Sequence, residues 1–245
     1  MGLTIHYHLS CDTRSDKKVH RIVEELRKRA LDLPFAEVGE VAELDGDRCD
    51  FQNYDGNDPL RWLAVQAGQH VERDGTYHRV QPNAVIAFTT WPGEGCEAAN
   101  FGLGIYPKTL SLRDEVKRQT RKLETGLSGW CWSSFCKTEY ASDPAAGGME
   151  NFLRCHLSVI RMLDHAKELG ILASVNDEGD YWEKRDVAAL AREVGEWNER
   201  MAGLVGKLKD MFGAGFDAPI TQFPDFEHLE ARGMNPKARA TDLEG

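Results

Sequence analysis

The feature that most constrains the fold of this 245-residue chain is a strand–helix–strand pattern that occurs twice. In the first unit, Leu3–Leu9 alternates between apolar and polar side chains, which is typical of a strand with one covered face. A helix with a regular apolar face is expected at about Asp16–Leu31, with Ser15 or Asp16 as its N-cap. A second strand is expected at Phe35–Val41.

The second unit repeats this plan near the end of the chain. Trp130–Tyr140 is expected to form a strand, Asn151–Gly170 a long amphipathic helix, and Ile171–Val175 another strand. The apolar spacing of Val187–Phe212 predicts one more helix. The C-terminal tail, at about 213–245, is rich in Gly and Pro and is expected to be extended.

The region between the two units, at about 45–127, is expected to be a mainly β insert. Asp74-Gly75 is a strong turn signal, and it predicts a hairpin that pairs His70–Arg73 with Thr76–Val80. A short polar helix is predicted at Ser111–Glu124.

Together these elements predict a single α+β domain over residues 1–245. If each unit has parallel strands and the first strands of the two units pair antiparallel, the result is a ferredoxin-like βαβ…βαβ antiparallel sheet. The β-rich insert then separates the two halves, and a helix is added after the second. A doubly wound parallel sheet is the alternative, which the hairpins in the middle of the chain disfavour. Whether the insert covers the sheet or extends it is left open.

Composition narrows the possible functions. Forty acidic residues against thirty Lys and Arg give a formal net charge of −10, which disfavours a general nucleic-acid-binding protein. No apolar run reaches the roughly 18–20 residues needed to cross a membrane. The six cysteines are scattered and form no CxxC pair, as is typical of reduced thiols. A soluble, cytoplasmic protein is therefore expected.

A His-x-His pair on the first strand is the sharpest chemical signal. His6 and His8 are two residues apart on a strand, so both imidazoles point to one face and can reach one divalent metal such as zinc. His156 or Cys136 is the expected third ligand. With Ser15-Asp16, the pair resembles the opening motif of the polymerase-and-histidinol-phosphatase-type phosphoesterases, although that family's later ligand motifs are missing. The alternative is an open sheet face on which both histidines are hydrogen-bonded or solvated.

Five further side chains are candidates for catalysis: Cys136, Lys137, Glu139, Asp177 and Glu178. The cysteine is a candidate nucleophile, the Lys–Glu pair a proton-transfer pair, and the two acids of the turn a general base. Each also has a structural interpretation: a small buried residue, a solvated strand face, and acids that favour the dipole of the next helix. The expected topology places the acidic turn near the start of the first strand, away from the histidine pair.

These observations favour a non-catalytic protein that binds a small-molecule ligand or a protein partner. Its candidate surface is the sheet face that carries His6 and His8, bordered by the hairpins of the insert. The alternative is a metal-dependent hydrolase that uses the His-x-His motif. A third hypothesis is an acidic inhibitor that neutralises a basic protein.

Overall fold

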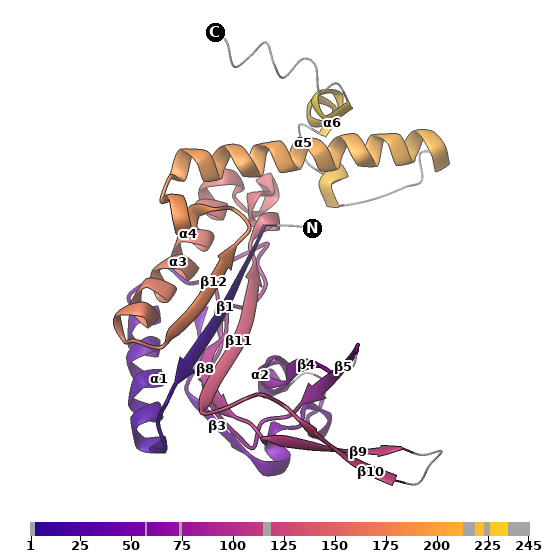
Figure 1. Cartoon of the computed structure of the whole chain (residues 1–245). Coiled ribbons are helices and arrows are strands. Elements are labelled where there is room, and N and C mark those ends of the chain that lie inside the picture. The colour runs from indigo at the N-terminus through magenta and orange to yellow at the C-terminus, as the bar shows by residue number, and fades with distance from the viewer. Residues whose placement is uncertain are drawn as a thin grey trace.

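A six-stranded sheet lies at the centre of the computed structural model (Figure 1). Its strands, in spatial order, are β12 (Leu172–Asp177), β1 (Thr4–Cys11), β11 (Trp130–Lys137), β8 (Phe101–Ile105), β6 (Ala84–Phe88) and β3 (Ala42–Asp45). All neighbouring strands pair antiparallel. The structure describes residues 3–56, 58–73, 75–114, 119–212, 219–222 and 226–234. The chain therefore has the α+β class predicted from the sequence.

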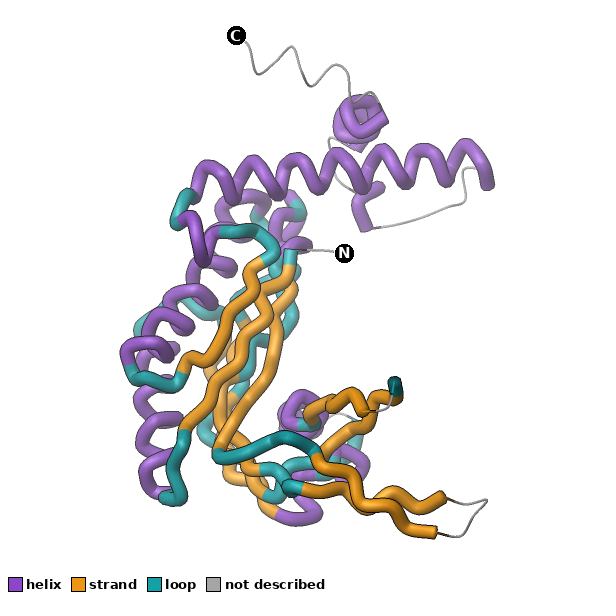
Figure 2. Tube along the Cα trace, in the orientation of Figure 1, coloured by secondary structure: helices purple, strands orange, loops and turns teal. Residues whose placement is uncertain are grey.

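Two helices, α1 (Asp16–Leu31) and α3 (Gly148–Glu168), cover one face of this sheet (Figure 2). The side chain of Ser15 caps α1 by accepting the N–H of Lys18, as expected. The buried side chains of α1 follow helical spacing: Val19, Val23, Leu26 and Ala30. They join Ile5, Tyr7 and Leu9 of β1 in the main hydrophobic core. The apolar half of the alternating β1 sequence therefore faces the helices.

Strand β1 lies between β11 and β12 and runs antiparallel to both. Ile5 lies opposite Cys136 on one side and Asp177 on the other. This arrangement confirms two predictions: the last strand runs antiparallel to the first, and the acidic turn lies near the start of the first strand. Strands β11 and β12 are therefore parallel to each other, with β1 between them.

The first strand–helix–strand unit differs from the prediction in the position of its second strand. The only strand within Phe35–Val41 is β2 (Glu37–Val38), which pairs with β7 (Thr90–Trp91) in a separate two-stranded sheet. The strand of the main sheet that follows α1 is β3, and β11, β8 and β6 lie between it and β1. Strands β6 and β8 belong to the insert, so part of the insert extends the sheet.

The rest of the insert projects in front of the open face of the sheet (Figure 1). Helix α2 (Pro59–Ala67) is followed by the hairpin of β4 (Gln69–Arg73) and β5 (Thr76–Val80), which confirms the predicted hairpin. Helix α2 itself was not predicted.

The helix expected at Ser111–Glu124 is wrong. This segment belongs to a second hairpin, formed by β9 (Thr109–Asp114) and β10 (Gln119–Glu124). Leu110 packs against a buried cluster that includes Val71 and Tyr106, and Leu123 is also buried. This non-local packing favours a strand over the local helical pattern.

Helix α5 (Val187–Phe212) has the predicted bounds and crosses the end of the sheet-and-helix layers (Figure 1). It follows the short helix α4 (Tyr181–Lys184). The tail expected to be extended includes helix α6 (Phe226–Met234), whose Phe226 packs with Ala202 and Val205 of α5. The extended prediction fails there because this apolar contact stabilises a helix.

Short 3-10 helices connect several of these elements: η1 (Gly46–Cys49), η2 (Phe51–Asn53), η3 (Glu139–Ser142), η4 (Pro144–Ala146) and η5 (Pro219–Gln222). Among the described residues, no helix is long and apolar enough to cross a membrane.

Candidate functional site

The open face of the sheet carries two rows of side chains across its three neighbouring strands β12, β1 and β11. His6 lies opposite Asn176 and Phe135, and its ring centroid is 5.7 Å from that of Phe135. Directly opposed residues of antiparallel strands have Cβ atoms about 4.5–5.5 Å apart, so each row forms a continuous surface. This first row combines an amide, an imidazole and a phenyl ring.

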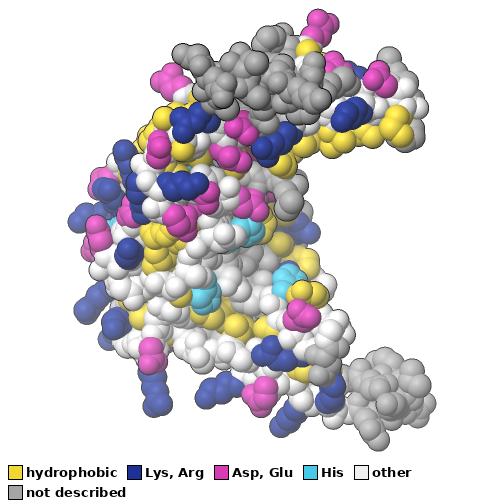
Figure 3. Space-filling model, turned by 45° about the horizontal axis from the view of Figure 1, so that its top comes forward, with side chains coloured by type: hydrophobic (Ala, Val, Ile, Leu, Met, Phe, Trp, Pro, Cys, Tyr) yellow, Lys and Arg dark blue, Asp and Glu magenta, His cyan; other side chains and the backbone are white. Residues whose placement is uncertain are grey.

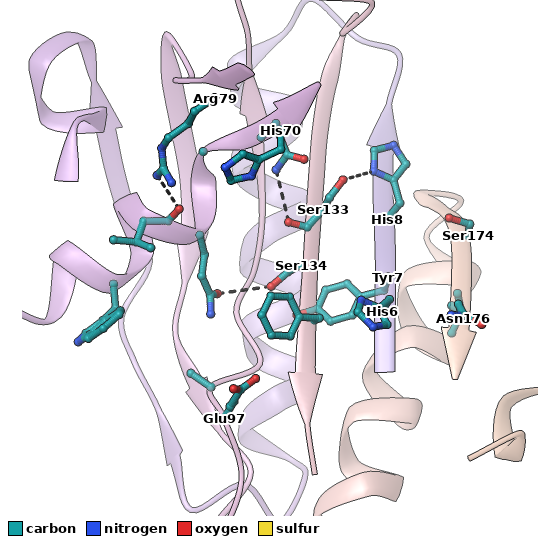
Figure 4. A pocket seen from close by; sticks show the side chains of 18 residues that line it. His6, Tyr7, His8, His70, Arg79, Glu97, Ser133, Ser134, Ser174 and Asn176 are labelled. Atoms are coloured by element: carbon teal, nitrogen blue, oxygen red, sulfur yellow. Dashed lines mark hydrogen bonds between the residues drawn. The ribbon is translucent and has the colours of Figure 1, made fainter. Parts of the chain in front are cut away.

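The second row is fully polar. His8 lies opposite Ser174 and Ser133, and its Nδ1 is 2.8 Å from Ser133 Oγ (Figure 4). Burial lowers the pKa of His8, because partial removal from water disfavours the charged imidazolium. At neutral pH this ring is therefore a neutral hydrogen-bonding group.

The insert forms the opposite wall of a groove over these rows, with a cavity volume of about 940 Å³. Trp62, Gln66, Gln69, His70 and Arg79 line this wall. They come from α2, β4 and β5, and Figure 4 shows the two walls facing each other. Histidine and hydrophobic side chains surround a hollow in the surface seen in Figure 3. The groove therefore lies between the sheet and the insert.

Two hydrogen bonds hold the insert against the sheet. Gln69 Nε2 donates to the carbonyl oxygen of Ser133 at 3.4 Å, and the hydroxyl of Ser134 donates to Gln66 Oε1 at 3.4 Å. In each bond one partner belongs to β11, and the other belongs to α2 or β4. These contacts fix the width of the groove.

Arg79 is held rigidly within the insert wall. Its Nη2 donates to the carbonyl oxygen of Val65 at 2.7 Å, and its guanidinium carbon is 4.8 Å from the ring centroid of Phe51. A Cβ at Gly68 would lie 2.3 Å from the same guanidinium, so glycine is required for this packing. Burial lowers the pKa of Arg79 from its ordinary value, but an arginine side chain remains charged at neutral pH.

The two expected third metal ligands do not lie in this groove. Cys136 and His156 are fully buried on the helix-covered side of the sheet, whereas His6 and His8 lie on the open side. Within the described parts of the chain, no group of three or more His, Cys, Asp or Glu side chains is placed to hold a metal ion. The structure places His6 and His8 in one groove, but neither candidate third ligand lies beside them.

Cys136, a candidate nucleophile, is a buried thiol. Its Sγ donates to the carbonyl oxygen of Glu97 at 3.2 Å. Burial raises the pKa of the Cys136 thiol, and the carboxylate of Glu97 acts in the same direction. A thiol with a raised pKa is a poor nucleophile at neutral pH, so this position fits the structural interpretation.

His156 instead pairs with Asp177 in the interior. His156 Nε2 is 3.3 Å from Asp177 Oδ2, and its Nδ1 is 3.0 Å from Thr138 Oγ1. This Thr–His–Asp chain has the connectivity of a catalytic triad, but Thr138 and His156 are completely buried and Asp177 is 3% exposed. A substrate cannot reach the Thr138 hydroxyl. The three hydrogen-bonded side chains therefore form a structural link between α3 and the ends of β11 and β12.

The two carboxylates of the acidic turn accept hydrogen bonds from backbone N–H groups. Asp177 accepts the backbone N–H of Gly179 at 3.0 Å and of Trp182 at 2.9 Å. Glu178 Oε2 accepts the backbone N–H of Thr4 at 3.0 Å. Neither carboxylate lines the groove.

Lys137 and Glu139 are close together, as predicted, but not as neighbours on a strand face. The strand ends at Lys137, and Glu139 begins η3, with 3.6 Å between Nζ and Oε2. Glu139 also accepts a hydrogen bond from Trp197 Nε1 of α5. Burial raises the pKa of Glu139 despite these partners. The pair connects the sheet with α5 outside the groove.

The sequence predicted hairpins of the insert beside this sheet face, but it did not predict α2, which forms the helical part of the wall. A signal for this helix is present: Asp58 is an N-cap whose side chain accepts the N–H of Leu60, and Pro59 occupies the first turn. Leu63, Ala64 and Ala67 are buried at helical spacing.

Compared with protein-family models, curated proteins and solved structures, the chain shows no significant match. The assignment of function therefore depends on the site itself.

Proposed function

We propose that this protein is a non-catalytic binding module whose groove takes a small ligand with a flat apolar part and several hydrogen-bonding groups. The observation that carries the proposal is the groove of about 940 Å³ over His6 and His8. Its volume lies within the range of roughly 300–1,000 Å³ that is typical of small-molecule sites.

The lining of the groove supports this ligand chemistry. Trp62 and Phe135 are 59% and 45% exposed, and both line the groove. Exposed aromatic side chains offer flat surfaces on which a planar ligand can stack. His8, Ser174 and Asn176 supply donors and acceptors along the floor. This mixture of apolar surface and a few polar groups is common in ligand sites.

The metal-dependent hydrolase remains the alternative function. It requires a third ligand for zinc, and the two candidates for that ligand lie on the other side of the sheet. Near-stoichiometric zinc that is lost in a His6→Ala/His8→Ala double variant would favour this alternative. Elemental mass spectrometry of the two proteins measures it directly.

We also propose that the sheet is ferredoxin-like, with β8 and β6 of the insert lying between β11 and β3. The arrangement of β11 and β12 on either side of β1 supports this relationship. A cytoplasmic location is proposed as well, since all six cysteines are free thiols.

Ligand binding is tested with a set of small heteroaromatic amides and carboxylic acids, by saturation-transfer NMR on the whole protein. Compounds that bind the parent should bind about tenfold more weakly to Trp62→Ala or Phe135→Ala, for a lost contact of about 1.4 kcal/mol. Tyr77→Ala is the matched control, because Tyr77 is a 70% exposed aromatic residue that does not line the groove.

The proposal predicts that the control variant retains the affinity of the parent. Equal affinities in the parent, both groove variants and the control would place the bound compounds elsewhere. That result would contradict the assignment of the groove as the binding site.

A further inference from the structure

The insert wall of the groove carries a positively charged side chain that has no acidic partner. Arg79 of β5 lies directly opposite His70 of β4, and both residues line the groove. Directly opposed residues of a hairpin have Cβ atoms about 4.5–5.5 Å apart. Among the described residues, neither side chain forms an ion pair, and the exposed His70 has no hydrogen bond. The guanidinium and the imidazole therefore lie in the wall as an adjacent pair.

The guanidinium of Arg79 keeps donors that no other described residue uses. Nη2 donates to the carbonyl oxygens of Val65 at 2.7 Å and Ala64 at 3.4 Å, whereas Nε has no partner in the described part of the chain. Burial lowers the pKa of Arg79, and the carboxylate of Asp50 opposes this effect. Asp50 is not a lining residue, however, and it accepts the backbone N–H of Gln52 at 3.0 Å. The two N–H groups of Nη1 are therefore left for a ligand.

Hydrogen bonds place His8 at the same end of the groove as this pair. Gln69, the neighbour of His70 on β4, donates to the carbonyl oxygen of Ser133 at 3.4 Å. The hydroxyl of that serine is 2.8 Å from His8 Nδ1, so Nε2 is the ring nitrogen of His8 left for a ligand. The side chains of His8, His70 and Arg79 form the donor end of the groove.

The acidic residue of the groove lies at the other end. Glu97 is the one carboxylate among the described lining residues. Its backbone N–H donates to the carbonyl oxygen of Lys137 at 3.0 Å, and Lys137 follows Ser133 on β11. At about 3.3 Å per residue, Lys137 and Ser133 are roughly 13 Å apart along the strand. Figure 4 likewise shows Glu97 at the opposite end of the groove from Arg79 and His70. Within the described lining, the donor end is therefore free of acidic side chains.

An aromatic surface lies between the two ends. Phe135, which is 45% exposed, is two positions beyond Ser133 on β11, or roughly 7 Å along the strand. The hydrogen bond between Ser134 and Gln66 holds α2 beside this part of the strand. Helix α2 also carries Trp62, the other exposed aromatic residue of the lining. A flat ring beside Phe135 can therefore direct a substituent toward the donor end.

We propose that the ligand of the groove is an aromatic carboxylate, with its carboxylate at the donor end and its ring against Phe135. This inference rests on the small-molecule site proposed above. Guanidinium N–H groups form strong, charge-assisted hydrogen bonds with carboxylates. Arg79 supplies one positive charge and the neutral His8 a hydrogen bond, so this end matches a single negative charge better than a phosphate dianion. Glu97 disfavours a second negative group at the far end.

The test compares aromatic carboxylic acids with their primary amides, which have nearly the same shape but no charge. Benzoic, naphthoic and indole carboxylic acids and their amides are the probes, and NMR titrations of the whole protein at neutral pH measure each Kd. The acids should bind about tenfold more tightly than their amides, because a hydrogen bond to a charged group is worth more than one to a neutral group. Acids that bind no better than their amides, failure to bind included, would overturn the inference.

A variant with an added carboxylate locates the charge. His70→Glu gives Arg79 an acidic partner inside the groove, so the acids should bind at least about tenfold more weakly while the amides keep their affinity. Thr76→Glu is the matched control, because Thr76 is an exposed residue of the same hairpin that does not line the groove. It should retain the affinity of the parent for the acids. Equal losses in the two variants would contradict the placement of the carboxylate beside Arg79.

Ser174→Asp is a second variant that decides the question if His70→Glu does not fold. Ser174 is exposed and lies opposite His8, so its replacement adds a carboxylate beside the donor end without disturbing the core. The acids should again lose affinity and the amides should not. Unchanged binding of the acids would contradict a carboxylate at His8.

Trp62→Ala separates this inference from the proposed function. If acids and amides bind equally well and both lose affinity in Trp62→Ala, the groove binds small ligands but the carboxylate inference is wrong. If no probe loses affinity in Trp62→Ala, Phe135→Ala or His70→Glu, the compounds bind elsewhere and both proposals are contradicted.

Discussion

Replacement of Asp177 by alanine should lower the free energy of unfolding by about 3–5 kcal/mol, because it removes a buried carboxylate and leaves its buried hydrogen-bond partners without an acceptor. Asp177 Oδ2 lies 3.3 Å from His156 Nε2, and both side chains are inaccessible to solvent. The same carboxylate accepts the backbone N–H groups of Gly179 and Trp182. Alanine removes the acceptor from all three groups, and no water can replace it at the buried imidazole.

Thermal unfolding measures this loss. For a protein of this size, 1 kcal/mol corresponds to roughly 2–4 °C, so the Tm of Asp177→Ala should fall by roughly 6–20 °C. Glu168→Ala is the matched control, because Glu168 pairs with His165 at 3.1 Å but its side chain is 74% exposed. This variant should lose less than about 1 kcal/mol. A similarly small loss in Asp177→Ala would refute the structural role assigned to the buried pair.

The same carboxyl group should make stability depend on pH in the acid range. Burial alone would raise its pKa, but the hydrogen bond and charge of His156 and the two backbone N–H groups hold the pKa of Asp177 below its ordinary value of 3.8. The unfolded chain therefore binds this proton first as the pH falls. The contribution of Asp177 is complete above its unfolded pKa and is lost as the pH falls through the lower folded pKa. Urea unfolding from pH 6 to pH 3 should show a steeper acid loss in the parent than in Asp177→Asn, and parallel curves would contradict this assignment.

Two further predictions concern packing and burial. Gly102→Ala should destabilise the protein by about 1–3 kcal/mol in urea unfolding, because its Cβ would lie 2.2 Å from that of Ala87 on the neighbouring strand. Gly56→Ala, with nothing within 4 Å, is the control, and equal losses in both variants would exclude this clash as the cause. Burial raises the pKa of Glu139 above its ordinary value of 4.5, despite the hydrogen bond from Trp197. The protonated carboxyl group contributes to stability at low pH, and this contribution to the free energy of unfolding is lost as the pH rises through the folded pKa. Glu139→Gln should therefore gain stability relative to the parent between pH 4 and pH 8 in urea unfolding, and a constant difference would refute the effect.

The elements that the sequence predicted well are those with local signals. Alternation along Leu3–Leu9 assigned each side chain of the first strand to a face, and Ser15 marked the start of α1. Asp74-Gly75 placed the turn of a hairpin whose strands have nearly the expected bounds. Such signals involve only residues close together in the sequence, so they are independent of the rest of the fold.

Apart from α2, whose capping signal is local, the elements that were missed depend on distant contacts. The β9–β10 hairpin packs the half-buried Leu110 against a cluster that includes Val71 and Tyr106, and it buries Leu123. Nothing in the segment itself specifies these contacts. The wall of the groove depends in the same way on Gln69 reaching across to the backbone of Ser133. The pairing of His156 with Asp177 joins a helix to a strand and has no fixed sequence spacing.

The two faces of the central sheet separate residues that were expected to lie in one site. Because side chains alternate along a strand, the residue types suggested for one metal or catalytic site divide between the two faces. Cys136 and His156 lie on the covered face, where helices exclude a substrate, while His6 and His8 lie on the face that the helices leave open. Only part of the insert reaches over that open face, so it forms a groove instead of a closed core. Cys136 and His156 are therefore buried in the core, and the groove that the insert forms over His6 and His8 is open to solvent.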